Sequence, residues 1–568
     1  RVTRRQVQQR KGERHHQPHE AGGDDHAPEQ GSRLHGWIMR SRRTASIAAL
    51  ALAVACGGPQ RPADVVVYAS GTDLESANPL ITIHPLSRQI QRHVLFVTLT
   101  RLDSALVQQP YLARRWMWNA NRSVLTMHLE PGVHWHDGER TTARDVRFTL
   151  LRGRDPRTGY PRSSDLAAID SVLVPSDSVV VVRFRAHQRD VPAVFAELPI
   201  VPEHLLRSVA PAELRRAGFS TAPVGNGPFR FVRRVAGQRW EFARNDSFPS
   251  SMGGPPRIRS LVVAVVDEPT TKFAGLAAGE LDVAGISASM ADLARRDPMI
   301  AVMDYPVLFS TGIVFNTHRA PFDDVRVRRA IGLSIDRQRI VAAALAGFGT
   351  PASGPVPPEN PLAANEPPAH EPALADALLD SAGWRRGTDG WRARGVPLDV
   401  ELLTVGSGDN AVEQLVQADL AARGIRLRVR PMELGAFLAR ARSHTKDFDV
   451  LITGVPGDLA LSYVGAMFES AQRGGALDYA SYRSATLDAL FGRVRQAVTG
   501  IELRNRWLNV QRQLALELPV AWIYHSRGLQ GVSARMRGVV FDLRGELATV
   551  THWTTDGSPP DGRSVARR

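Results

Sequence analysis

The sequence predicts a secreted α/β protein with two large lobes, and three observations lead to this fold class. The 568 residues are 43% hydrophobic and 23% charged, which is a globular composition at a length that usually means more than one domain. Short β-branched runs alternate with helix-length stretches in both halves of the chain. A short apolar segment near the amino end has the form of an export signal.

In the first half, three β-branched runs bounded by turn residues predict strands at 64–69, 178–184 and 261–266. After the third run the pattern changes to a helix at 270–279 and then to a strand at 281–284. This order predicts a βαβ unit.

The second half repeats the alternation and predicts a second α/β lobe with its own sheet. Strands are expected at 313–316, 398–403, 425–429 and 448–453, and helices at 325–335, 337–346, 410–422 and 434–442. Asp336 is the expected N-cap of the second of these helices. Eight prolines between 351 and 372 indicate an extended loop. Residues 487–518 are expected to form one long helical stretch that ends at Pro519.

The formal charge of +14 invites a nucleic-acid hypothesis, but the distribution of the charge argues against it. Only three of the 71 basic residues are lysines, namely Lys11, Lys272 and Lys446. Such a preference for arginine across the whole chain is typical of coding bias. No arginine cluster stands beside aromatic residues, so we expect no nucleic-acid partner.

The amino-terminal region has the pattern of an export signal rather than that of a folded domain. Arg40, Arg42 and Arg43 precede an apolar run at 45–55, and the run ends in small residues before Cys56. The run is shorter than the about 20 residues that span a bilayer. Cys56 is the single cysteine of the chain, which excludes an internal disulfide, a zinc–cysteine cluster and a CxxC redox site.

A cysteine directly after the cleavage site resembles a bacterial lipoprotein signal. The resemblance implies that 39–55 is the signal peptide and that Cys56 carries a lipid anchor on the outer face of a membrane. Ala53 stands where such signals usually have leucine, and ordinary cleavage beside an incidental cysteine is the alternative. Residues 1–38 fit neither interpretation and are expected to be an upstream, disordered leader.

Three motifs follow one another between residues 110 and 146. They are PYLARRW at 110–116, LEPGVHWHDG at 129–138 and TARDV at 142–146. Asp137-Gly138 predicts a tight turn after a strand, and Thr141 or Thr142 is placed to cap a helix that begins near Ala143. This series resembles the signature of the peptide- and nickel-binding family of ABC-importer solute receptors, known as family 5 of the bacterial solute-binding proteins.

Further motifs follow in the order of that family, so the resemblance covers essentially all of residues 61–550. They are PVGNGPF at 223–229, NDSF at 245–248, FNT at 315–317, VRVRRAI at 325–331, IDR at 335–337 and a closing helix at 506–519. The resemblance implies the two-lobed type II periplasmic-binding-protein fold with an extra subdomain in the first lobe. Lobe I would span 61–308 with an insertion near 91–219, lobe II would span 309–520, and 521–568 would return to lobe I.

The same resemblance implies a function. A small solute, expected to be a di- or oligopeptide, would bind between two closing lobes and pass to a membrane-embedded ABC permease. We expect a monomer without a cofactor. Asp458 is the expected partner of the ligand's amino terminus, because a buried carboxylate facing an ammonium is favoured where the ligand supplies the missing charge. Val455, Pro456 and Phe96 complete the expected ligand contacts.

Two alternatives remain open at this point. His134 and His136 lie on alternate residues of a strand, so a metal or metallophore receptor of the same fold is the second hypothesis. We read both histidines as scaffold and assign no metal site. The sequence contains no GxSxG, HExxH or phosphate-loop motif, so we do not expect an enzyme. A regulator that contacts DNA is a further hypothesis. Residues 1–38 contain no helix-turn-helix motif, and the export signal argues against contact with DNA.

Overall fold

The computed structural model describes residues 62–555 except 83, 365, 368, 407–409 and 476. All of them belong to one compact unit, Pro62–Arg568. Its largest element is an eleven-stranded mixed sheet with the strand order β18-β17-β19-β12-β20-β11-β1-β10-β9-β8, to which β13 (Gly349–Pro351) adds by pairing with β20. The expected α/β class is therefore present.

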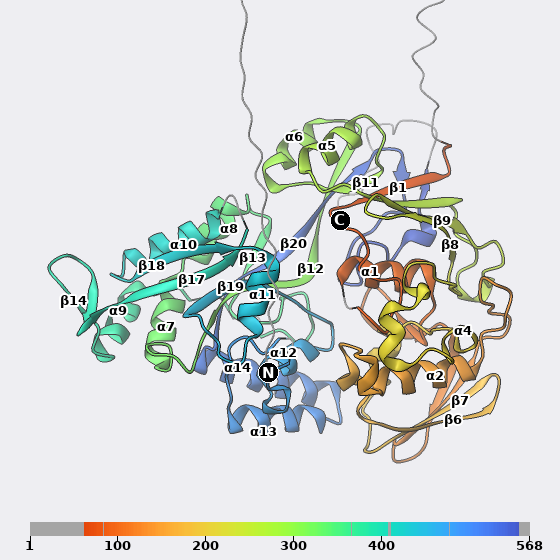
Figure 1. Cartoon of the computed structure of the whole chain (residues 1–568), viewed down its shortest axis with the longest axis horizontal. Coiled ribbons are helices and arrows are strands. Elements are labelled where there is room, and N and C mark those ends of the chain that lie inside the picture. The colour runs from red at the N-terminus through yellow and green to blue at the C-terminus, as the bar shows by residue number, and fades with distance from the viewer. Residues whose placement is uncertain are drawn as a thin grey trace, which may run out of the picture. The chain divides into compact units, whose positions relative to one another are not determined.

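One end of this sheet is formed by five strands from the amino-terminal half of the chain. They are β1 (Val65–Ser70), β8 (Phe229–Val235), β9 (Arg239–Arg244), β10 (Ser260–Val265) and β11 (Val283–Gly285). Helices α5 (Pro269–Ala277) and α6 (Ala291–Arg296) pack at this end (Figure 1). The predicted βαβ unit is present, and β1 lies between its two strands because β10 and β11 both pair with β1 in parallel.

A separate antiparallel sheet with the order β4-β5-β7-β6 lies within the expected insertion. Its strands are β4 (Ala113–Trp118), β5 (Val124–Leu129), β6 (Ile169–Ser176) and β7 (Val179–Phe184), and helix α2 (Ala143–Arg154) packs beside it (Figure 1). Thr142 caps α2 as predicted, and Asp145 completes a capping box by accepting from the Thr142 backbone N–H. Gly138 takes a positive φ of 98° in the expected turn after the strand.

The other end of the large sheet carries the second α/β region. Its strands are β17 (Asp399–Val405), β18 (Arg426–Met432) and β19 (Val450–Pro456). Its helices are α7 (Val325–Ser334), α8 (Arg337–Ala344), α9 (Pro372–Ser381), α10 (Ala411–Ala421), α11 (Leu434–Arg442) and α12 (Ser462–Phe468). Asp336 caps α8 as predicted, by accepting from the Arg339 N–H at 2.9 Å. Two hydrophobic cores, one with Phe437 and Phe468 and one with Phe315 and Val400, fill this region.

The prediction of one helical stretch at 487–518 was wrong. The structure has two helices, α13 (Ala485–Arg495) and α14 (Gly500–Glu517). Thr499 begins the second helix with a capping box, since its side chain accepts from the Glu502 N–H while Glu502 accepts from the Thr499 N–H. A β-branched residue before Gly500 favours this local cap over a continuous helix.

Two long strands in the middle of the sheet connect its two ends. They are β12 (Ile300–Phe315) and β20 (Val520–Ser533), and they pair with each other in antiparallel fashion. The strand predicted at 313–316 is only the end of β12. Their register shifts between Pro306 and Ser310. On one side of this shift β11 pairs with β20, and on the other side β19 pairs with β12. We call residues 62–308 and 527–555 lobe I and residues 309–526 lobe II.

Because β20 pairs with β11 as well as with β12, we assign parts of it to both lobes, and the predicted lobe boundaries stay a prediction. The short elements α1 (Pro85–Ile90), β2 (Thr100–Leu102) and β3 (Gln108–Pro110) precede the inserted sheet, and β21 (Met536–Arg537) and β22 (Thr554–Thr555) follow β20. The remaining short strands, β14 (Arg385–Arg386), β15 (Arg392–Arg394) and β16 (Val396–Pro397), form a small sheet in lobe II.

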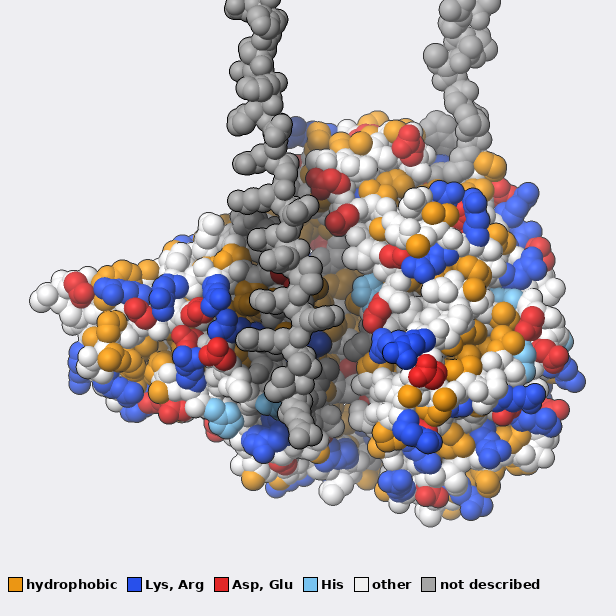
Figure 2. Space-filling view, viewed as in Figure 1, with side chains coloured by type: hydrophobic (Ala, Val, Ile, Leu, Met, Phe, Trp, Pro, Cys, Tyr) orange, Lys and Arg blue, Asp and Glu red, His pale blue; other side chains and the backbone are white. Residues whose placement is uncertain are grey.

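Basic and acidic side chains are interspersed on the face of the molecule that Figure 2 shows, without one continuous basic surface. Among the described helices, none combines the length and the apolar character needed to cross a bilayer.

Candidate functional site

A cavity of about 420 Å³ lies between the two lobes, at the place where β12 and β20 change neighbours. Small-molecule sites in proteins usually enclose about 300–1,000 Å³. Lobe I lines this cavity with parts of 68–72, 84–92, 305–308 and 542–546 together with Glu197, Lys272, Gly285 and Gln530, and lobe II lines it with Phe309 and 456–459. The cavity thus has one wall from each lobe, and Val307 and Leu308 of the irregular segment of β12 lie between them.

Asp458 lines the lobe II wall, directly after β19, and is 6% exposed. Its Oδ1 accepts from the N–H groups of Ala460 (3.0 Å) and Ser462 (3.1 Å). Its Oδ2 accepts from the Ser462 hydroxyl (2.7 Å) and from the Tyr463 N–H (3.1 Å). An ionised carboxylate offers about four acceptor sites, so this carboxylate is already fully occupied in capping the start of α12.

The three other residues expected to contact the ligand lie in different surroundings. Pro456 lines the cavity beside Asp458. Val455 is 1% exposed and packs in the lobe II core, because successive side chains of a strand point to opposite faces. Phe96 is fully buried in the lobe I core, where its ring lies 5.9 Å from that of Phe219. Neither Val455 nor Phe96 lines the cavity.

Glu546, from the segment after β20, faces the cavity on the lobe I wall. Its carboxylate accepts from the Tyr305 hydroxyl at 2.5 Å and from the Tyr68 hydroxyl. Both tyrosines are buried, at 3% and 4% exposure. Burial first, and then the charge of Glu546, raise the pKa values of both phenols, so they remain protonated donors.

Glu197 belongs to the same wall and is held by arginines. It accepts from Arg88 at 2.9 Å and from Arg162, and its side chain is 3% exposed. Burial by itself would raise the pKa of Glu197, but Arg162, Arg88 and Arg92 lower it to about 2. The carboxylate is therefore ionised and paired throughout the neutral range.

Two cationic side chains on the lobe I wall have no carboxylate paired with them among the described residues. Lys272 and Arg92 form no ion pair with any described residue, although Asp267 acts on Lys272 from nearby. Burial lowers the pKa of Lys272, and burial lowers the pKa of Arg92 to about 10, so Arg92 remains cationic at neutral pH. The cavity therefore offers occupied carboxylates and unpaired cations, which favours a ligand that carries an anionic group.

Sequence patterns predict almost none of the residues of this wall. Lys272 was noted as one of only three lysines, but Glu546, Tyr68 and Tyr305 belong to no motif and come from three distant segments. They meet because β1 and β12 lie in one sheet and the chain returns to lobe I after β20. A search for charged residues near strand ends would have found Lys272 at most.

The two histidines of the H-x-H motif are separated by their burial. His134 is exposed and its Nδ1 lies 2.9 Å from the Gly132 carbonyl, whereas the half-buried His136 places Nε2 3.1 Å from the Gly227 carbonyl. Burial lowers the pKa of His136 to about 4. Within the described residues no three His, Cys, Asp or Glu side chains are grouped to hold a metal ion. Cys56 and the predicted signal lie outside the described residues.

Comparison with known proteins gives a family match over residues 108–473, to the model described as "Bacterial extracellular solute-binding proteins, family 5 Middle". A putative ABC transporter peptide-binding protein of Brucella ovis is 29% identical over 252 residues, which are 44% of this chain and 47% of that relative. The chain thus matches about half the length of that curated relative. The oligopeptide-binding protein AppA of Bacillus subtilis is 24% identical over 510 residues, with 88% of this chain and 92% of the relative covered.

Solved structures agree in fold. AppA of Bacillus subtilis in complex with a nonapeptide superimposes with a TM-score of 0.76 at 22% identity, covering 87% of this chain and 99% of that one. NikZ of Campylobacter jejuni in complex with Ni(L-His) gives a TM-score of 0.76 at 21% identity, covering 87% and 100%. The predicted two-lobed periplasmic-binding fold is confirmed by this likeness.

Proposed function

The chain belongs to family 5 of the bacterial extracellular solute-binding proteins, and we propose that it captures a short peptide between its two lobes and delivers it to an ABC importer. The observation that carries the proposal is the cavity between the lobes, walled by one segment of lobe II and several of lobe I. The Brucella relative, a putative peptide-binding protein, and the Bacillus relative, an oligopeptide-binding protein, support the solute class.

The charges of the cavity suggest how a peptide would be held. Lys272 and Arg92 receive the ligand's carboxylate, because they are the cations without an ion-pair partner. Asp458 remains the candidate for the amino terminus, through its negative charge and after rotation of the Ser462 hydroxyl frees one acceptor site. Pro456 contributes apolar contact. We leave Val455 and Phe96 out of this contact set, since both lie in the cores.

Calorimetry with a small set of di- and tripeptides tests the proposal. Free peptides, their N-acetyl derivatives and their C-terminal amides are titrated in parallel, and we expect amidation to weaken binding more than acetylation does. If no peptide binds while nickel or a nickel chelate does, the metal-receptor alternative that the NikZ likeness suggests replaces this function. If neither class binds, the assignment to solute capture at this cavity fails.

An enzymatic role has little support in the described residues. Ser310 and His525 form a hydrogen bond of 2.8 Å, but they are 2% and 4% exposed and neither lines the cavity. Burial lowers the pKa of His525 to about 4. The pair therefore stabilises lobe II rather than meeting a substrate.

We further propose that the protein is a monomer tethered to the outer face of a membrane through Cys56. The motif before Cys56 supports the tether, and the family's extracellular character supports the location. Intact mass of membrane-extracted protein tests this proposal, with Cys56 expected as a lipid-modified amino terminus. An unmodified chain that begins elsewhere contradicts it.

A further inference from the structure

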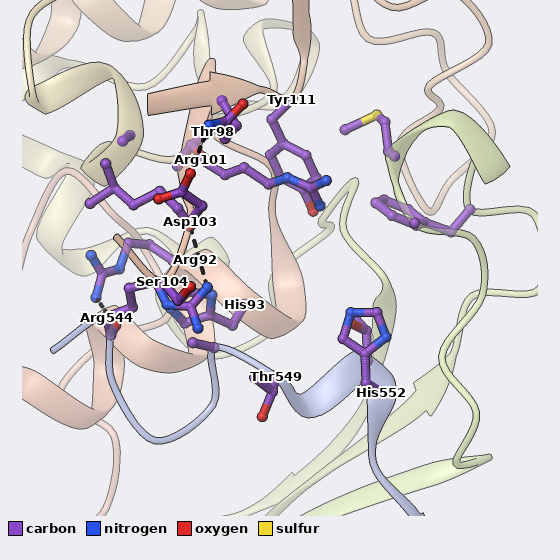
Figure 3. A pocket seen from close by; sticks show the side chains of 18 of the residues that line it. Arg92, His93, Thr98, Arg101, Asp103, Ser104, Tyr111, Arg544, Thr549 and His552 are labelled. Atoms are coloured by element: carbon purple, nitrogen blue, oxygen red, sulfur yellow. Dashed lines mark hydrogen bonds between the residues drawn. The ribbon is translucent and has the colours of Figure 1, made fainter. Parts of the chain in front are cut away.

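A second cavity, also about 420 Å³, lies wholly within lobe I. Three parts of the chain enclose it: the helical turn η1 (Gln91–Leu95) with β2 and the turn after it, the segment 248–254, and the segment 544–552 that follows β20. Figure 3 shows Arg92, His93, Ser104 and Arg544 close together on one side and Tyr111 on the other. Arg92 lines both cavities, and the proposed peptide capture uses no other residue of this one.

Its lining is strongly basic. Arg92, Arg101 and Arg544 line it together with one carboxylate, that of Asp103, and Arg544 is already paired with Asp542 at 2.6 Å. The oxygens of Asp103 are occupied by the loop that carries it: Oδ1 accepts from the Ala105 and Val107 N–H groups at 3.0 and 2.9 Å, and Oδ2 accepts from the Gln109 amide at 2.8 Å. Asp103 therefore shapes the loop and leaves the basic character of the cavity in place.

Two buried nitrogen atoms on η1 have no hydrogen-bond partner among the described residues. They are Nε of Arg92 and Nε2 of His93. The one hydrogen bond that Arg92 makes is long, from Nη2 to the Arg544 carbonyl at 3.3 Å. Burial, and then the charges of Arg92 and Arg544, lower the pKa of His93 to about 3, so the imidazole is neutral. Buried polar atoms without partners are rare in native proteins, and a ligand that supplies the missing partners explains them.

We propose that this lobe I cavity binds a small oxyanion, a phosphate or carboxylate group on an organic body. Arg92 and Arg101, which form no ion pair with any described residue, meet the anionic group, and Ser104 and Thr549 add hydroxyl donors. Arg544 keeps its pairing with Asp542. The organic body lies along Tyr111 and Phe248, which also line the cavity. The Arg101 guanidinium is 5.4 Å from the centre of the Tyr111 ring, which helps to hold it at the cavity.

Arg101 and His93 are the residues that test this site without disturbing peptide capture. Arg92 lines both cavities and is unsuitable, whereas Arg101 and His93 line only the lobe I cavity. Arg101 is exposed and forms no ion pair with any described residue, so its loss should leave the fold intact. Arg115 is an equally exposed arginine that lines neither cavity, and Arg115→Gln is the matched control.

The full-length protein is titrated calorimetrically with inorganic phosphate and with phenyl phosphate at constant ionic strength. We expect both to bind, phenyl phosphate more tightly, and Arg101→Gln and His93→Gln to weaken binding about tenfold or more while Arg115→Gln does not. Glycerophosphoglycerol, a lipid headgroup without acyl chains, is titrated in parallel. If it alone binds with this mutational pattern, the anion derives from lipid rather than from a free phosphate ester.

The proposal fails if none of the three anions binds, or if Arg101→Gln and Arg115→Gln bind equally well. The His93→Gln result counts only if this variant unfolds at the same midpoint as wild type. If its midpoint differs, the Arg101→Gln result alone tests the proposal. Failure here leaves peptide capture untouched, because peptide affinity is measured separately at the cavity between the lobes.

Discussion

The two walls of the cavity between the lobes hold their charges in different ways. On the lobe II wall, the one carboxylate, Asp458, is fully hydrogen-bonded by its own loop. On the lobe I wall, carboxylates and cations come from segments far apart in the chain, and Glu197 links Arg88 to Arg162. The charges of the lobe I wall therefore depend on tertiary structure. Two cations of this wall, Lys272 and Arg92, form no ion pair with any described residue.

The difference teaches where ligand recognition and stability are coupled. A locally capped carboxylate persists whenever α12 forms, whereas the lobe I network exists only in the folded lobe. The lobe II wall also acts on lobe I, since burial first, and then the charge of Asp458, raise the pKa of Asp165, a lobe I residue outside the cavity lining, against the opposing effect of Arg162. A ligand between them enters a field that both lobes set.

The largest effect is expected from breaking the lobe I network at Glu197. Glu197→Gln leaves the guanidinium groups of Arg88 and Arg162 without their shared anion in a site where Glu197 is 3% exposed. Removing one partner of a buried ion pair typically costs about 3–5 kcal/mol of unfolding free energy. Urea unfolding measures it, and Glu213→Gln, which removes an exposed carboxylate paired with Arg216, is the control. Equal midpoints for the two variants would refute the comparison.

The same network predicts a window of acid sensitivity. The pKa of Glu197 is lowered from about 4.5 to about 2, so its contribution is complete above pH 4.5 and is lost as pH falls toward 2. A shift of this size corresponds to roughly 3 kcal/mol. Unfolding free energy measured from pH 5 to pH 2 should fall more steeply for wild type than for Glu197→Gln. Parallel curves would mean that other carboxylates control the acid transition.

A smaller effect, on affinity rather than stability, is expected at Lys272. Lys272→Gln removes an unpaired cation from the lobe I wall and should weaken peptides with a free carboxylate by about 1.5–3 kcal/mol, or roughly tenfold to 150-fold. C-terminal amides should bind the variant and wild type alike. Calorimetry of both ligand forms provides the comparison, and a loss that is equal for acids and amides would point to altered shape instead of charge.

How much of this could be predicted from the sequence depends on the range of the contacts. Local patterns gave β1, β10, α7 and α8 to within about two residues, and the Thr142 cap of α2 followed from neighbouring residues. The length of β12 was missed because its amino-terminal half, 300–308, lacks a continuous β-branched run. Glu546 with Tyr68 could not be predicted, because a contact between residues 478 positions apart leaves no local pattern.

The expected role of Asp458 shows the same limit from the other side. Asp458 was expected at the ligand, and it does line the cavity just after β19, which runs three residues further than the predicted strand. Its four hydrogen bonds depend on Ser462 and Tyr463 starting a helix at that point, which the sequence around Asp458 does not reveal. Sequence identified the position, and only the backbone geometry showed how its acceptors are used.

The smallest effect is therefore expected at Asp458, and it separates a cap from an anchor. Asp458→Asn keeps one acceptor oxygen but replaces the other with a donor, which cannot accept from the Tyr463 N–H or the Ser462 hydroxyl. Loss of a helix cap costs about 0.5–2 kcal/mol of stability. Ser462→Ala is the matched control, since it removes one donor to the cap and leaves the charge.

If Asp458 also attracts the ligand's amino terminus, Asp458→Asn should weaken free peptides about tenfold, or roughly 1.4 kcal/mol, and leave N-acetyl peptides unchanged. Ser462→Ala should bind both forms as wild type does, or slightly better, because one acceptor site is freed. Calorimetry of the three proteins with both ligand forms separates the cases. If Asp458→Asn and Ser462→Ala lose similar stability and neither changes affinity, Asp458 is a cap alone. The lobe I wall then supplies the charge recognition of this cavity, because its unpaired cations face the ligand without a competing internal partner.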